Sequence, residues 1–128
     1  VSVAAEEGGY ASQGAVKRAH QFLVALMTVA GEVPADPDAG TSFAGALLSG
    51  SLRSEDAIIF AFNEARTQIL QKFMEEETAD TPAEDVVTAV DLQGVSVSRG
   101  FALIRFRVAT EGGSASVVVP VKNPGVTR

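Results

Sequence analysis

Apolar residues recur at three- and four-residue spacing along two stretches of the chain, and this is the period of an α-helix with one buried face. The first stretch begins after Ser12, a suitable N-cap, and ends at Gly31, a common C-terminal stop. Its apolar positions are Ala15, Val16, Ala19, Phe22, Leu23, Leu26, Met27 and Ala30. The pattern therefore predicts an amphipathic helix between Ser12 and Gly31.

The second stretch predicts a longer helix. Ser54 is its expected N-cap, and Glu55 and Asp56 stand in the first turn, where the helix dipole favours negative charge. The apolar stripe consists of Ile58, Ala61, Phe62, Ala65, Ile69 and Phe73, and it is widened by Ile59, Leu70 and Met74. We expect this helix to run to about Glu76.

Residues 31–53 connect the two predicted helices. Prolines and glycines punctuate this segment, which is the composition of a loop. It is long for a connection inside a compact domain, so we expect a surface arm. Within it, Phe43–Leu48 is expected to form either a turn of helix or an apolar plug into the core.

An acidic connector, Glu75–Asp85, follows the second helix, and the structure that comes after it has two interpretations. Thr81-Pro82-Ala83-Glu84 matches a capping box with proline at the first helical position, which would begin a third short helix. The β-branched residues from Val86 onward favour a strand instead. We favour a strand from about Val87, interrupted near Gly94, and residues 82–92 remain open between helix and strand.

Alternating residues near the C-terminus predict a three-stranded antiparallel meander. Its strands are Val95–Ser98, Phe101–Thr110 and Ser114–Val121, with turns at Arg99-Gly100 and Gly112-Gly113. In the middle strand, one side carries Ala102, Ile104, Phe106 and Val108, and the other carries Leu103, Arg105, Arg107 and Ala109. In the last strand, Ala115, Val117, Val119 and Val121 are expected to face inward. Pro120 cannot donate a ladder hydrogen bond, so this strand is expected to lie at an edge.

These elements predict an α+β fold with two long amphipathic helices packed on a small antiparallel meander and an extended N-terminal arm. No internal repeat or composition shift divides the chain, so we expect one domain. Its expected parts are the arm at 1–11, the helical part at 12–77 with the loop at 31–53, the meander at 86–121 and a tail at 122–128.

Composition and charge narrow the function. The chain has no cysteine, which excludes disulfides and thiolate chemistry. Its net charge of −6 argues against a direct nucleic-acid partner, because duplex-binding domains carry basic patches. The longest apolar run, Phe22–Val29, is too short to span a membrane, so we expect a soluble protein without a membrane partner.

Candidate chemistry is sparse. His20 is the only histidine, no Gly-x-Ser-x-Gly elbow accompanies it, and we expect a boundary or surface residue of the first helix. Asp36-Pro37-Asp38 resembles the start of a calcium loop, but Leu47 stands where the twelfth-position glutamate is needed, so we expect a turn. The sequence therefore predicts no catalytic residue, no cofactor and no metal site.

The arginines of the meander suggest a contact surface. Arg99, Arg105 and Arg107 are opposite in charge to the acidic connector, so they are candidates to meet carboxylates of a neighbouring subunit. Phosphate binding and a simple solvated sheet face are the alternatives. The valine-rich last strand is uncharged, and an edge of this kind is open to another chain. The predicted interface residues are Val1, Val3, Tyr10, Arg99, Arg105, Arg107, Val117 and Val119.

We therefore expect a non-enzymatic structural subunit of an oligomeric assembly, such as a virion component, whose partners are copies of itself or other subunits. The alternative is a small ligand-binding or regulatory module. An enzyme with an unusual site is the third class, and a carboxylate buried beside His20 would favour it.

Overall fold

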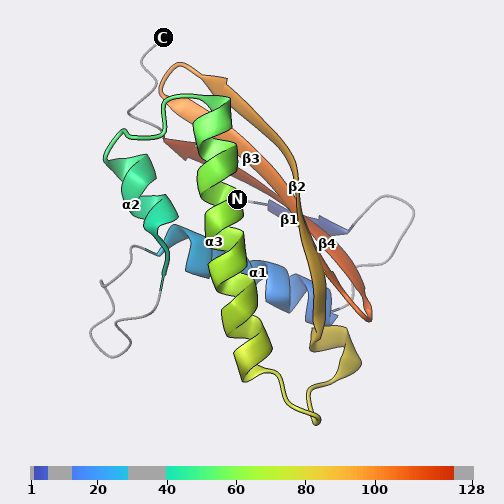
Figure 1. Cartoon of the computed structure of the whole chain (residues 1–128). Helices are drawn as coiled ribbons and strands as arrows, with labels where there is room; N and C mark the ends of the chain where they lie inside the picture. Colours follow the sequence, from blue (N-terminus) through green and yellow to red (C-terminus); the bar gives the residue numbers. More distant parts are fainter. Residues whose placement is uncertain (1, 6–12, 29–39, 123–128) are drawn as a thin grey trace.

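The fold is that of a computed structural model, in which residues 2–5, 13–28 and 40–122 are described. Across these residues, α-helices pack against one four-stranded antiparallel sheet with the strand order β1-β4-β3-β2 (Figure 1). The helices are α1 (Gln13–Met27), α2 (Ser42–Leu48) and α3 (Glu55–Glu76), followed by a 3₁₀ turn, η1 (Ala83–Asp85). The strands are β1 (Ser2–Ala5), β2 (Val87–Ser98), β3 (Phe101–Thr110) and β4 (Gly113–Lys122).

Two tight hairpins build the meander β2-β3-β4. Ser98 lies opposite Phe101 in the first hairpin, and Gly100 in its turn has φ of 74°, a left-handed conformation that glycine adopts without strain. The second hairpin closes with Thr110 opposite Gly113. β2 has two shifts of register against β3, which leave Thr88 and Gln93 as extra residues, and such bulges bend and twist a strand.

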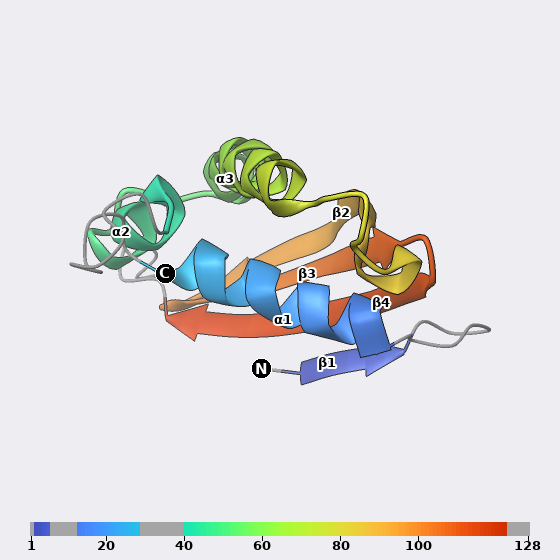
Figure 2. The same cartoon turned by 90° about the horizontal axis from the view of Figure 1, so that it is seen from below.

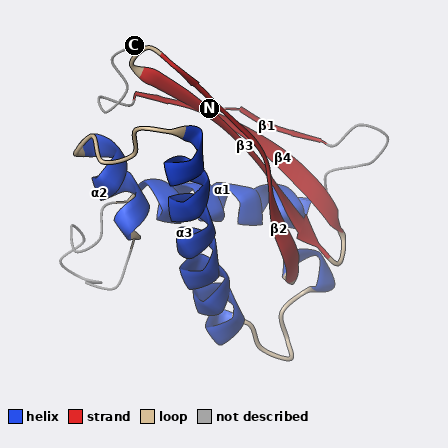
Figure 3. Ribbon diagram, turned by 45° about the horizontal axis from the view of Figure 1, so that its top comes forward, coloured by secondary structure: helices blue, strands red, loops and turns tan. Residues whose placement is uncertain are grey.

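The core lies on one face of the sheet, because every second residue of β3 and β4 is buried there. Figure 3 shows the helices gathered on one side of the strands. The buried sheet residues are Val90, Ala102, Ile104, Phe106, Val108, Ala115, Val117, Val119 and Val121. Phe22 of α1, Phe43 of α2 and Phe62 of α3 are fully buried in the same core.

Local chemistry sets the beginnings of two helices. The Ser54 side chain accepts a hydrogen bond from the Ala57 amide at 3.1 Å and caps α3. Thr41, which is buried, caps α2 by accepting from the Phe43 amide at 3.2 Å, and its hydroxyl donates to the Leu26 carbonyl at 3.3 Å. One side chain thereby begins α2 and fixes it to the last turn of α1.

The α+β class and the antiparallel meander are confirmed. The two predicted helices are α1, with 15 residues, and α3, with 22. Between them, Phe43–Leu48, for which the sequence left a turn of helix or a plug, belongs to the short helix α2. The open question over residues 82–92 is resolved in favour of the strand, since β2 begins at Val87, after the short turn η1.

The N-terminal arm needs a correction. Ser2–Ala5 is not an unpaired extension, because it forms β1 and pairs with Ala115–Val118 of β4. The last strand is therefore not the edge of the sheet along this length, contrary to the prediction from Pro120. The rest of the predicted arm, with Val1 and Tyr10, lies outside the described residues, as do Asp36-Pro37-Asp38 and the tail beyond Lys122.

Candidate interface on the open face of the sheet

The face of the sheet turned away from the helices, called the open face below, is formed by the alternate residues that the core does not use. On β3 these are Phe101, Leu103 and Arg105, all exposed. Phe101 keeps 54% of its surface accessible and Leu103 keeps 37%. Their neighbours across the register are Ser96 and Ser98 of β2 and Val118, Pro120 and Lys122 of β4. The open face therefore presents exposed apolar side chains next to the basic residues Arg105 and Lys122.

The structure separates the three predicted arginines. Arg99 lies exposed in the β2–β3 turn, and Arg105 is exposed at the centre of the open face. Arg107 has a partner within its own chain, since its Nη2 donates to Oδ2 of Asp91 on β2 at 2.9 Å. Arg107 is therefore engaged across the sheet, whereas among the described residues no carboxylate forms an ion pair with Arg105.

The predicted valines take a different place. Val117 and Val119 face the helices and are almost fully buried, so their side chains are not available to a partner. The reason is the alternation of β4, which puts every odd-numbered residue from 115 to 121 into the core. Val3 lies in β1, where its backbone pairs with Val117.

Both edges of the sheet are protected against pairing with another strand, so the open face is the more available contact surface. β1 covers β4 from Ala115 to Val118, and the exposed Pro120 stands on the stretch beyond. β2, the other edge, carries its two bulges, and Arg66 of α3 donates from Nη1 to the Val90 carbonyl at 3.2 Å. Bulges and covered backbone groups are the devices by which proteins prevent unwanted strand pairing.

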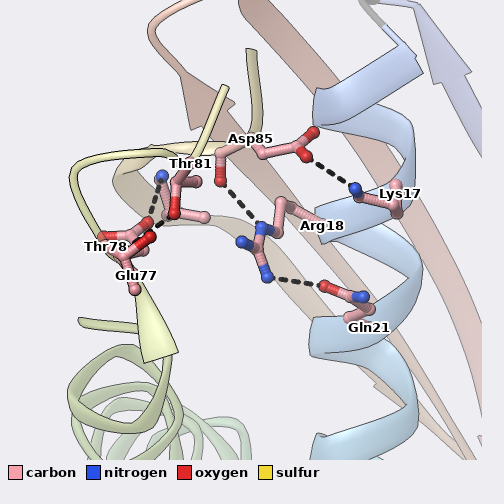
Figure 4. Close-up of polar contacts among 8 residues, drawn as sticks. Lys17, Arg18, Gln21, Glu77, Thr78, Thr81 and Asp85 are labelled. Atoms are coloured by element: carbon pink, nitrogen blue, oxygen red, sulfur yellow. Dashed lines mark hydrogen bonds and ion pairs between the residues drawn. The ribbon is translucent and has the colours of Figure 1, made fainter. Parts of the chain in front are cut away.

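The acidic connector is held by its own chain. Figure 4 shows Lys17 and Arg18 of α1 reaching toward Asp85. Nζ of Lys17 donates to Oδ2 of Asp85 at 2.6 Å, and Nε of Arg18 donates to the Asp85 carbonyl at 2.7 Å. At the other end, the Glu77 carboxylate accepts from the Val87 amide at 3.1 Å. The carboxylates of Asp85 and Glu77 are therefore bound within the chain. The exposed carboxylates of the connector are those of Glu75, Glu76, Asp80 and Glu84.

Charge is divided between the two layers of the described chain. The helical part, residues 13–28 and 40–86, carries nine Asp and Glu residues against five Lys and Arg residues. In the sheet hairpins, residues 87–122, four basic residues stand against two acidic ones. The sheet layer is therefore positive and the helical layer negative, a polarity that the net charge of −6 conceals.

A second candidate site is a groove of about 590 Å³ between α1 and α3, open to the outside and bordered by Gly40 and Thr41. Its lining includes the apolar residues Val24, Ile69 and Phe73 and the polar residues His20, Lys72 and Glu76. His20 is exposed, as predicted, and lies at the groove. Glu76 is also exposed, so the lining does not provide the buried carboxylate that would favour an enzyme.

The sequence pattern misplaced Met74 of α3. Met74 was placed in the widened stripe but is 71% exposed, whereas Phe60, which the stripe left out, is 67% exposed. They lie on the side of α3 opposite its buried residues Ile58, Phe62, Ala65, Ile69 and Phe73. The 3.6-residue period could have shown that Phe60 and Met74 share an exposed side of the helix, because they fall near one line that excludes Phe62 and Ile69.

No described helix is both long and apolar enough to cross a membrane. Within residues 2–5, 13–28 and 40–122, no three side chains of the metal-binding types come together. Comparison with protein-family models, with curated proteins and with solved structures finds no match. The class that the described residues define is α+β, with α1, α2 and α3 on one face of an antiparallel sheet.

Proposed function

We propose that this chain is a non-enzymatic structural subunit of an oligomeric assembly, a virion being one such assembly, and that it associates through the open face of its sheet. The observation that carries the proposal is the exposure of Phe101 and Leu103 beside Arg105 on a face that no described helix covers. Aromatic residues and arginine are enriched at protein interfaces, and contiguous exposed apolar residues mark sites of association.

One further observation supports association through the open face. Its central charge, Arg105, has no ion-pair partner among the described residues.

The test is the mass of the purified chain in solution, measured by sedimentation velocity from low to high concentration. We expect species that are multiples of 13.3 kDa and increase with concentration. Phe101→Ser should weaken association, whereas Leu48→Ser, which removes an even more exposed apolar side chain from α2, should leave it unchanged. A chain that stays monomeric at every concentration and has no partner protein contradicts the proposal.

A small ligand-binding module is the second candidate, and the groove between α1 and α3 favours it. Its volume of about 590 Å³ lies in the range of small-molecule sites, and its apolar lining with a few polar groups is typical of them. An environment-sensitive apolar dye should bind there, and Val24→Glu should abolish the signal without changing the oligomeric mass. If Val24→Glu leaves dye binding intact, this groove is not the site.

A further inference from the structure

We propose that the assembly forms head to tail: the open face of one copy binds the outward stripe of α3 on the next copy. The outward stripe consists of Phe60, Glu64, Thr67, Gln71 and Met74, which are all exposed. This inference rests on the proposed function and names the partner, a second copy of the same chain, and the surface that it offers.

The outward stripe is a surface that the fold leaves without a described partner. Its residues recur at three- and four-residue spacing, so they follow one line along the helix. Phe60 and Glu64 face outward, because the residues on the opposite side of α3 are buried in the core. Farther along the helix, Thr67, Gln71 and Met74 also border a shallow depression against β2. Phe60 and Met74 make the outward stripe apolar at two places, and Glu64 supplies a carboxylate beside Phe60.

The spacing of the two surfaces agrees. Phe60 and Glu64 are four residues apart on a helix, which is a rise of about 6 Å. Leu103 and Arg105 are two residues apart on a strand, which is about 7 Å. When Phe60 of one copy lies over Leu103 of another, Glu64 therefore reaches Arg105. One placement satisfies both an apolar contact and an ion pair.

The charge of the two layers selects this pairing over the symmetric ones. Open face against open face would bring positive surfaces together, and stripe against stripe would bring carboxylates together. Sheet layer against helical layer pairs a basic surface with an acidic one, and such complementarity sets orientation and suppresses the like-charge alternatives.

The two surfaces lie on opposite sides of the molecule. The helical layer stands on one side of the sheet (Figure 2), and the buried residues of α3 face the core, so Phe60 and Glu64 on the opposite side of the helix point away from it. A copy bound through its open face therefore keeps its own outward stripe free for the next copy. A contact of this kind is heterologous, and repetition yields a ring if the rotation closes or a filament if it does not.

The experiment is a charge swap between the two surfaces, measured as the association constant by sedimentation velocity at low salt. Glu64→Arg and Arg105→Glu should each lower the constant about tenfold or more, because each places like charges together. The double variant should return it to within about threefold of the starting value. Glu111→Arg, the same change in a turn remote from both surfaces, serves as the control. Both swapped residues are exposed, and equal unfolding midpoints verify that folding is unchanged.

The outcomes separate this inference from the function on which it rests. If the chain assembles and the double variant is no better than the single ones, the head-to-tail contact is overturned while the structural function stands. If Arg105→Glu weakens assembly but Glu64→Arg does not, the open face binds something other than α3, and the inference is again overturned. If the unmodified chain stays monomeric without a partner protein, both proposals fail.

Discussion

The rings of Phe62 on α3 and Phe106 on β3 are in contact, with their centroids 5.5 Å apart, and both side chains are fully buried. Phe22 of α1 contacts both, at 5.8 Å from Phe62 and 5.0 Å from Phe106. Phe43 of α2 joins through the edge of its ring, 6.4 Å from Phe62. One aromatic cluster therefore connects all three described helices to the sheet.

Removing the ring of Phe62 should be costly. Phe62→Ala is expected to lower the free energy of unfolding by about 3–5 kcal/mol, through lost burial and the cavity that remains. Denaturant unfolding at a concentration where the chain is monomeric measures the change. Phe60→Ala, two residues away but exposed, should change stability by less than about 0.5 kcal/mol. A loss below about 1 kcal/mol for Phe62→Ala would mean that α3 does not pack as described.

A second prediction concerns the start of α1, where Gly14 is buried against η1. A Cβ atom at this position would overlap the backbone carbonyl of Glu84. Gly14→Ala should therefore destabilise the chain by about 1–3 kcal/mol, although alanine is the better helix former by about 1 kcal/mol.

Gly94→Ala is the control for this prediction. There the added Cβ would meet Nη2 of Arg105 at 3.3 Å, and that flexible side chain can move aside. We expect a change within about 0.5 kcal/mol. Thermal unfolding measures the stability of both variants. Equal stability of Gly14→Ala and Gly94→Ala would contradict the close contact between α1 and η1.

The ion pair between Lys17 and Asp85 should stabilise the contact between α1 and η1. Asp85→Asn keeps the volume but removes the charge from a carboxylate that is largely buried, so we expect a loss of about 1–2 kcal/mol. The neighbouring Glu84 is exposed, and Glu84→Gln should have almost no effect on stability. If both variants unfold at the same denaturant concentration, the pair contributes nothing to stability.

Deletion of residues 1–5 should increase aggregation rather than remove an assembly contact. It uncovers β4 from Ala115 to Val118, a stretch without charge, and exposed strand edges of this kind pair with other chains. Light scattering measures the effect, and deletion of residues 123–128 is the control for shortening the chain. Adding Val118→Lys to the first deletion should suppress the scattering. Unchanged scattering after the deletion would show that β1 has no protective role.

Much of the fold was predictable because the signals were local. α3 has a serine cap, two acidic residues in its first turn and a long apolar period, and it begins at Glu55 as expected. The meander followed from alternation and from its two glycine-containing turns. α2 was predicted only as one of two alternatives, since it is short and depends on Thr41. β1 was not predictable in this way, since it depends on a strand far along the chain.

The candidate site was predictable only in part. Alternation places Phe101, Leu103 and Arg105 on one side, and the structure leaves that side open. The pairing of Arg107 with Asp91 was not predicted, because counting residues back from the β2–β3 turn puts Asp91 opposite Val108. The extra residue Gln93 shifts the register by one and brings Asp91 opposite Arg107. Gly94 was the available signal, because a glycine inside a strand often marks a bulge, and the interruption expected there is a bulge within one continuous strand.

The pairing of β1 with β4 also bears on how the chain folds. The meander needs only neighbouring residues, and hairpins of this kind form within microseconds. β1 instead closes a loop that runs from Ala5 to Ala115, almost the whole length of the chain. The entropy of that closure is lost before any contact is gained, so the pairing comes late. During synthesis, β1 therefore leaves the ribosome well before its partner β4 and has to wait for it.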